Sequence, residues 1–173
     1  MQADVESGLI KLAQQRNADA FTELMQSQMQ AMYKTARAIL KNDEDVADAI
    51  SETILICWEK MKQLKKPEFF KTWLTRILIN ECNNILRQRK RVHPVEEVEE
   101  TAGTVYEYEN VEWIEMMNGL DEKYRLVMIL YYVNGLNTTE IASALHIPVS
   151  TVRTRLSRGR KQMALLYGAE KRN

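Results

Sequence analysis

The sequence predicts an all-α protein made of two small helical domains. Apolar residues recur at helical spacing over most of the 173 residues, and no β-branched alternating run indicates a strand. Only three prolines and six glycines interrupt these repeats. Between residues 92 and 110 the repeat fails and glutamates crowd the chain, which is typical of a linker. We therefore expect residues 1–91 and 111–173 to form helical domains joined by an acidic linker, 92–110.

The formal net charge of zero hides segregated blocks of charge. Residues 60–91 hold ten basic side chains against two acidic ones, and residues 149–173 hold seven against one. Residues 92–122 hold ten acidic side chains and no basic one. Each expected domain therefore carries a basic segment, and the neutrality is a cancellation between blocks.

The first two predicted helices are scaffold. The first, at residues 4–16, is a short amphipathic helix that carries Val5, Leu9, Ile10 and Leu12. The second, at residues 19–40, has a long apolar repeat rich in methionine, which is more typical of an adaptable core than of a ligand site.

The third predicted helix, at residues 44–63, has two contrasting sides. Its inner side carries an apolar stripe that includes Val46, Ala47 and Ile50. Its outer side is acidic and is edged by two branched apolar residues, a composition typical of a protein docking surface, although a merely solvated face is the alternative. This outer side comprises Asp45, Asp48, Glu52, Leu55, Ile56 and Glu59.

A loop and a fourth helix follow. Pro67 opens the loop at residues 63–70, which also carries Lys65, Lys66, Phe69 and Phe70. One side of the helix is apolar. The other interleaves cations and amides with an aromatic ring, as nucleic-acid surfaces do, while loop phenylalanines can stack unpaired bases. Core packing is the alternative for Phe70 and Trp73. This polar side comprises Trp73, Arg76, Asn80, Asn83, Asn84, Arg87 and Arg91.

Residues 137–163 predict a helix-turn-helix. A helix resumes at about residue 111, and another spans residues 121–133 and ends before Gly135. Thr138 or Thr139 can then cap a short helix, Pro148 prevents its continuation, and Ser150 or Thr151 can cap the next one.

The last helix has a buried and a basic side. Val152, Leu156 and Gly159 share the buried side, where the glycine allows close approach of another helix. The opposite side combines small hydroxyls with arginines and no acid, which suits base edges and phosphates in the major groove; a solvated basic face is the alternative. It comprises Ser150, Thr151, Arg153, Thr154, Arg155, Ser157, Arg158, Arg160 and Lys161.

The residues give no indication of an enzyme. His93 and His146 lack catalytic neighbours, and Cys57 and Cys82 have no metal-ligand spacing, so we expect no cofactor, metal or small-molecule substrate. No secretory or membrane-spanning pattern is evident, which predicts a cytoplasmic protein. A stand-alone helix-turn-helix regulator, with a sensing or dimerising first domain, is the alternative reading.

Several motifs resemble one family in that family's own order. The stretch from Asp45 to Thr53 with Trp58, and the stretch from Phe70 to Ile77 with Asn80 and residues 87–91, look like region 2 of the extracytoplasmic-function sigma factors of bacterial RNA polymerase. Glu140 to Ala142, His146 to Pro148 and residues 151–160 are similar to region 4. Ser51 and His146 depart from the family's usual residues.

The resemblance implies roles for the three surfaces. The acidic side of the third helix would bind core RNA polymerase. The loop and the polar side of the fourth helix would melt and hold the −10 element, and Thr154, Ser157 and Arg158 would read the −35 element. An anti-sigma factor, in many relatives membrane-bound, would restrain the protein until an envelope or other stress releases it.

Overall fold

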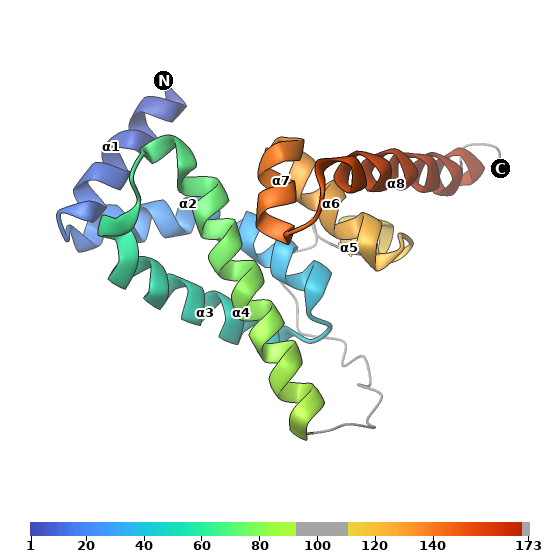
Figure 1. The fold of residues 1–173 in the computed structure, drawn as a ribbon, viewed down its shortest axis with the longest axis horizontal. Helices are drawn as coiled ribbons and strands as arrows, with labels where there is room; N and C mark the ends of the chain where they lie inside the picture. The colour runs from blue at the N-terminus through green and yellow to red at the C-terminus, as the bar shows by residue number, and fades with distance from the viewer. Residues whose placement is uncertain (93–110, 171–173) are drawn as a thin grey trace.

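The computed structural model describes residues 1–92 and 111–170, and within these ranges every regular element is helical (Figure 1). The predicted linker lies outside the described residues from position 93 onward. The elements are α1 (Gln2–Gln14), α2 (Ala18–Ile39), α3 (Asp43–Lys60), the 3-10 turns η1 (Met61–Gln63) and η2 (Pro67–Phe69), α4 (Phe70–Val92), α5 (Val111–Asn118), α6 (Glu122–Tyr132), α7 (Thr138–Leu145) and α8 (Val149–Glu170).

Asparagine side chains cap the starts of α2 and α3. The Asn17 side chain accepts a hydrogen bond from the Ala20 N–H at 2.9 Å and caps α2. The Asn42 side chain accepts one from the Asp45 N–H at 2.8 Å and caps α3. Each cap satisfies a backbone donor that the helix leaves without an internal partner.

Helices α1 to α4 pack around one apolar core. Leu24, Leu40, Val46, Met61 and Leu78 are among its fully buried side chains. The predicted inner face of α3 is right for Val46 and Ile50 but wrong for Ala47, which is exposed while Ala49 is buried. In α2, Met29 belongs to the methionine-rich apolar repeat but is 40% exposed. The four helices form the frame for the loop at residues 63–70.

Helices α6, α7 and α8 form a second packed group. Val127, Leu130, Ile141, Val152 and Leu156 are buried in it. Gly159 confirms the expected close approach, since a Cβ built there would lie 2.9 Å from Cγ of Met128 on α6. The α8 helix is thereby fixed against α6 with its other side exposed.

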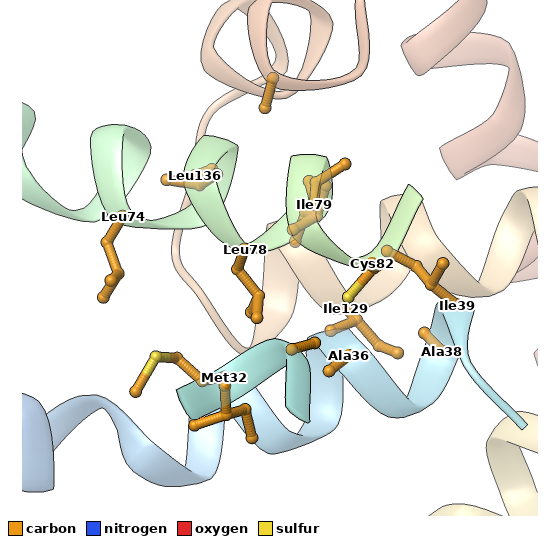
Figure 2. Close-up of a cluster of buried hydrophobic side chains, with 14 of the residues drawn as sticks. Met32, Ala36, Ala38, Ile39, Leu74, Leu78, Ile79, Cys82, Ile129 and Leu136 are labelled. Carbon is orange, nitrogen blue, oxygen red and sulfur yellow. The ribbon is translucent and has the colours of Figure 1, made fainter. Parts of the chain in front are cut away.

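The two groups contact each other directly: α6 packs on α2, and α7 packs on α4. Ile129 and Leu136 belong to the same cluster of buried side chains as Ala36, Ala38 and Ile79 (Figure 2). Both groups therefore contribute to one continuous apolar core across their boundary.

Candidate nucleic-acid interface

The helix-turn-helix is built by a reciprocal cap and a left-handed turn. The Glu140 N–H donates to Oδ1 of Asn137 at 2.9 Å, and the Asn137 N–H donates to Oε2 of Glu140 at 2.8 Å. The expected cap at Thr138 or Thr139 is therefore wrong by one or two residues, because the asparagine carboxamide reaches the third helical N–H first. His146 ends α7 with φ 54°, a conformation that changes the direction of the chain before Pro148.

The exposed side of α8 matches the predicted basic surface. Ser150 and Thr151 lie within its first turn and are not caps, since α8 begins at Val149. The Thr154 hydroxyl donates to the Ser150 carbonyl at 2.9 Å, so it must rotate before it can bind another acceptor. Thr151 and Arg155 are half-buried. The exposed members are Ser150, Arg153, Thr154, Ser157, Arg158, Arg160 and Lys161.

Arg160 differs from its neighbours because its guanidinium is bound to α6. Its Nε donates to the Tyr132 hydroxyl at 2.7 Å, and the group lies 5.5 Å from the ring centre of Tyr131 and 5.7 Å from that of Tyr132. The hydrogen bond to Tyr132 raises the pKa of Arg160 above its ordinary value. Arg158 instead lines a groove with Ser150, Thr154 and Lys123, where a ligand can reach it.

The loop at residues 63–70 separates into a buried end and an exposed tip. Phe70 is fully buried, so its prediction as an exposed base-stacking residue is wrong; it continues the inward stripe of Leu74 and Leu78 at helical spacing. Phe69 is 50% exposed, with the Lys66 ammonium 5.9 Å from its ring centre. Lys65 and Lys66 are exposed as predicted.

The polar side of α4 extends from this loop along the helix. Trp73 is half-buried, with its ring 6.3 Å from that of Phe70. Beyond it, exposed cations and amides follow one another at spacings of three and four, and therefore share one side of the helix. These residues are Arg76, Asn80, Asn83, Arg87 and Arg91.

The predicted acidic side of α3 is exposed except at its first member. Asp48, Glu52 and Glu59 are exposed, Leu55 is 58% exposed, and Ile56 is half-buried.

Asp45 is buried, so the prediction of an exposed carboxylate there is wrong. Arg89 on α4 donates from Nη2 to its Oδ1 at 2.8 Å, and the Asn42 carboxamide donates to Oδ2 at 3.0 Å. The hydrogen bond to Asp45 is also the main reason that the pKa of Arg89 lies above its ordinary value. Asp45 thus ties the start of α3 to the end of α4 and is not available to a partner.

Sequence reasoning missed a polar contact between the two helical groups. Nδ2 of Asn134 donates to Oγ1 of Thr35 at 3.1 Å and to Oγ1 of Thr75 at 3.4 Å, and both threonines are buried. The Asn134-Gly135 pair is a turn signal, and Gly135 has φ 68°, but a turn signal does not say what the asparagine will contact.

One groove contains residues from both predicted DNA surfaces. Asn80 and Asn83 of α4 line it together with His146 and Arg155 of the helix-turn-helix. The structure therefore brings the two surfaces to the same cleft between the helical groups.

The cysteines are buried thiols. Burial raises the pKa of Cys57 and of Cys82 to about 12, so both remain protonated at neutral pH. Within the described ranges, 1–92 and 111–170, His, Cys, Asp and Glu form no group that could hold a metal. None of the helices in that part of the chain is long and apolar enough to cross a membrane.

Comparison with known proteins matches both halves of the chain. Residues 24–92 match the sigma-70 region 2 family, and residues 110–163 match sigma-70 region 4. The chain is 28% identical to the ECF RNA polymerase sigma factor SigW of Bacillus subtilis, over 89% of this chain and 92% of that protein. It is 28% identical to SigV of the same organism, over 79% and 84%.

Two solved structures share the fold. CnrH in complex with the cytosolic domain of CnrY aligns with a TM-score of 0.67 and 24% identity, over 95% of this chain and 98% of that one. The sigma factor RpoE in complex with the anti-sigma factor NepR, from Bartonella quintana, aligns with a TM-score of 0.69 and 21% identity, over 84% and 97%.

The two matches, region 2 followed by region 4, define a transcription initiation factor and not an enzyme. The chain belongs to the sigma-70 family, as an RNA polymerase sigma factor of the extracytoplasmic-function group. A stand-alone regulator is not favoured, because the first helical group matches region 2.

Proposed function

We propose that the chain works through three surfaces, each presented by a different helix. Residues 1–91 form the module that binds core polymerase and the −10 element, and residues 111–173 form the module that binds the −35 element, with 92–110 as linker. The observation that carries the proposal is the contrast in composition between these surfaces: acidic and apolar on α3, cationic with amides on α4, and cationic without acids on α8.

The −35 surface is the exposed side of α8. Thr154, Ser157 and Arg158 are the base-reading residues, because short hydroxyls and a bidentate guanidinium suit the donor and acceptor pattern of the major groove. Arg153 and Lys161 lie at the margins of this side, where phosphates would flank the groove. The buried Gly159 holds α8 close to α6 and so fixes the angle at which this side is presented.

The −10 surface is the loop tip with the polar side of α4. Phe69 offers an exposed ring for stacking an unpaired base, and Lys65 and Lys66 offer charge for its phosphate. Arg76, Asn80 and Asn83 continue the path along the helix. Arg87 and Arg91 extend it to the last turns of α4.

The polymerase surface is the outer side of α3 without Asp45. Leu55 supplies the apolar centre, and Asp48, Glu52 and Glu59 supply a negative rim, with Ile56 at its edge. An apolar centre inside a charged rim is the usual composition of a protein interface, and its negative charge calls for a basic patch on the polymerase.

The same reasoning extends to control and location. We propose that the protein works in the cytoplasm, where polymerase and promoters are, and that an anti-sigma factor restrains it until an envelope or other stress. The solved relatives bound to CnrY and NepR support such a partner. A membrane-bound anti-sigma factor would hold the chain at the inner face of the membrane.

The test combines binding with transcription. The purified chain should co-migrate with core polymerase in gel filtration, and the reconstituted holoenzyme should start transcripts downstream of paired −35 and −10 sequences mapped after overexpression. A chain that binds DNA but never co-migrates with polymerase would instead be a stand-alone regulator.

The surfaces are tested by one variant each. Leu55→Asp should abolish co-migration, Arg158→Ala should change −35 preference, and Phe69→Ala should slow promoter opening. If Leu55→Asp co-migrates as wild type does, the α3 surface is wrongly assigned.

A further inference from the structure

Helix α1 contacts the chain on both sides of the exposed tip of the predicted −10 loop. Nε2 of Gln14 donates to the Leu64 carbonyl at 2.8 Å and to the Met61 carbonyl at 3.3 Å. Met61 and Leu64 are themselves buried, so one carboxamide fixes two carbonyls immediately before the exposed loop tip. A glutamine that serves two long-range backbone acceptors is a specific arrangement, since most side-chain hydrogen bonds are local or reach water.

Arg16 holds the chain a few residues before Met61. Its Nη1 donates to the Trp58 carbonyl at 2.7 Å, and its guanidinium lies 5.2 Å from the centre of the Trp58 ring. This carbonyl belongs to the last turn of α3. The last carbonyl groups of a helix lack a partner within the helix and carry partial negative charge. Arg16 adopts φ 67° at the end of α1, an unusual conformation for a non-glycine residue.

A third contact fastens the far side of the loop. Glu6 of α1 lies 3.8 Å from the Lys71 ammonium, in the first turn of α4. Helix α1 also packs against both 3-10 turns of the loop, η1 and η2. Helix α1 thus holds the backbone at residues 58, 61 and 64 and the side chain of Lys71. The side chains of Lys65, Lys66 and Phe69 project from the loop and are exposed.

We propose that Gln14 and Arg16 are positioning residues for promoter melting. They hold the loop in the conformation that presents Phe69 and the two lysines to a base leaving the duplex. This inference rests on the proposed role of the loop in binding the −10 element. A loop ordered in advance does not lose its conformational entropy at the moment of strand separation, so opening is faster.

The expected effect is on the rate of opening and not on docking. Gln14→Leu removes both donors at similar size and should slow open-complex formation on duplex promoter about tenfold, as expected for one to two neutral hydrogen bonds. Arg16→Gly should also slow it, and glycine tolerates the positive φ without strain. Gln15→Leu, at an exposed neighbouring position, is the matched control and should open promoters as wild type does.

The experiment uses reconstituted holoenzyme on two templates. One is duplex promoter, and the other carries a mismatched bubble across the −10 region. Gln14→Leu and Arg16→Gly should open duplex slowly, bind core polymerase normally and initiate at nearly the wild-type rate on the bubble. A general folding defect would instead lower polymerase binding and both templates together. Equal losses on both templates, or a normal rate on duplex for both variants, would overturn the inference.

A second comparison separates this inference from the loop's proposed function. Phe69→Ala alters the loop tip directly and leaves the contacts of α1 in place. If Phe69→Ala opens duplex promoter normally, the loop does not melt DNA and the proposed function of this surface fails. If Phe69→Ala is slow while Gln14→Leu and Arg16→Gly are normal, only the positioning role fails.

Discussion

Two aspartates one turn apart on α3 have opposite surroundings. Asp45 is buried between Asn42 and Arg89, whereas Asp48 is exposed and lines a groove with Glu52 and Arg87. The same residue type therefore serves the fold at one position and is available to a partner at the other.

Substitution should separate these two roles. Asp45→Ala leaves the Asn42 and Arg89 donors without their acceptor and should lower the free energy of unfolding by about 1–2 kcal/mol, a value reduced because Arg89 is partly exposed. Asp48→Ala should leave stability unchanged and weaken binding to core polymerase. Urea unfolding and gel filtration with polymerase measure the two effects. Equal stability losses in both variants would contradict this assignment.

Alanine substitutions at three arginines of α8 should have three different effects. Arg158→Ala should cost about 1–3 kcal/mol and relax selectivity at one or two −35 positions. Arg153→Ala should weaken all promoters alike and reduce the salt slope by about one unit. Arg160→Ala should mainly lower stability, by about 0.5–1 kcal/mol, because its guanidinium is bound to Tyr132 and lies over two rings.

The assay is transcription by holoenzyme on a library of −35 sequences at several salt concentrations, with thermal unfolding of each free variant. If Arg158→Ala lowers every promoter equally, α8 binds DNA without that base contact. If Arg160→Ala alone changes base preference, the tyrosine contact is released on DNA binding.

At the scale of elements, sequence periodicity predicted most of the buried faces but not every position on them, since Met29 on α2 and Ala47 on α3 are exposed. Val152, Leu156 and Gly159 lie inward on α8 as expected. Among the candidate site residues, the errors fall in first turns of helices, at Asp45 and Phe70. Asp45 finds its partner 44 residues away, and Phe70 begins the inward stripe of α4 in a stretch that sequence alone assigns to a loop. Long-range partners and exact helix starts are tertiary properties, which local spacing does not contain.

Two helical glycines allow the packing of α8 to be tested. A Cβ at Gly8 on α1 would meet nothing within 4 Å, whereas one at Gly159 would lie 2.9 Å from Cγ and 3.1 Å from Sδ of Met128. Gly8→Ala should stabilise the protein by up to about 1 kcal/mol, the helix-propensity gain. Gly159→Ala has the same gain but should be destabilising by about 1 kcal/mol net, because over-packing costs about 1–3 kcal/mol.

Thermal unfolding of both variants beside the wild type measures this difference. Both variants add the same methyl group to a helix. Stability changes of opposite sign would therefore measure the packing of α8 against α6. A stabilised Gly159→Ala variant would mean that Met128 moves aside at little cost, and α8 would then not be held by close approach.

At the scale of the whole molecule, the contact between the two helical groups conflicts with promoter binding. The −10 and −35 elements are centred about 25 base pairs apart, as their names indicate. This separation is roughly 85 Å along the axis of the DNA. Yet Asn80 and Asn83 of the proposed −10 surface line one groove with Arg155 of α8, on the proposed −35 surface. If α4 and α8 bind the two elements as proposed, the arrangement in this structure must open before both are bound.

Asn134 is the residue through which this opening can be tested. Its carboxamide donates to the buried Thr35 and Thr75 across the boundary. Asn134→Ala removes two neutral hydrogen bonds, about 1–3 kcal/mol, and should shift the equilibrium between closed and open forms about 5- to 150-fold toward the open form. Asn118→Ala, at an exposed position on α5, is the control.

Small-angle scattering of the free protein should show a larger radius of gyration for Asn134→Ala than for wild type or Asn118→Ala. Binding to core polymerase should tighten in parallel, because polymerase no longer has to separate the two groups at a free-energy cost. An unchanged radius together with a lower melting temperature would show that Asn134 supports the fold and does not control opening. A larger radius without tighter polymerase binding would show that the closed form does not compete with polymerase.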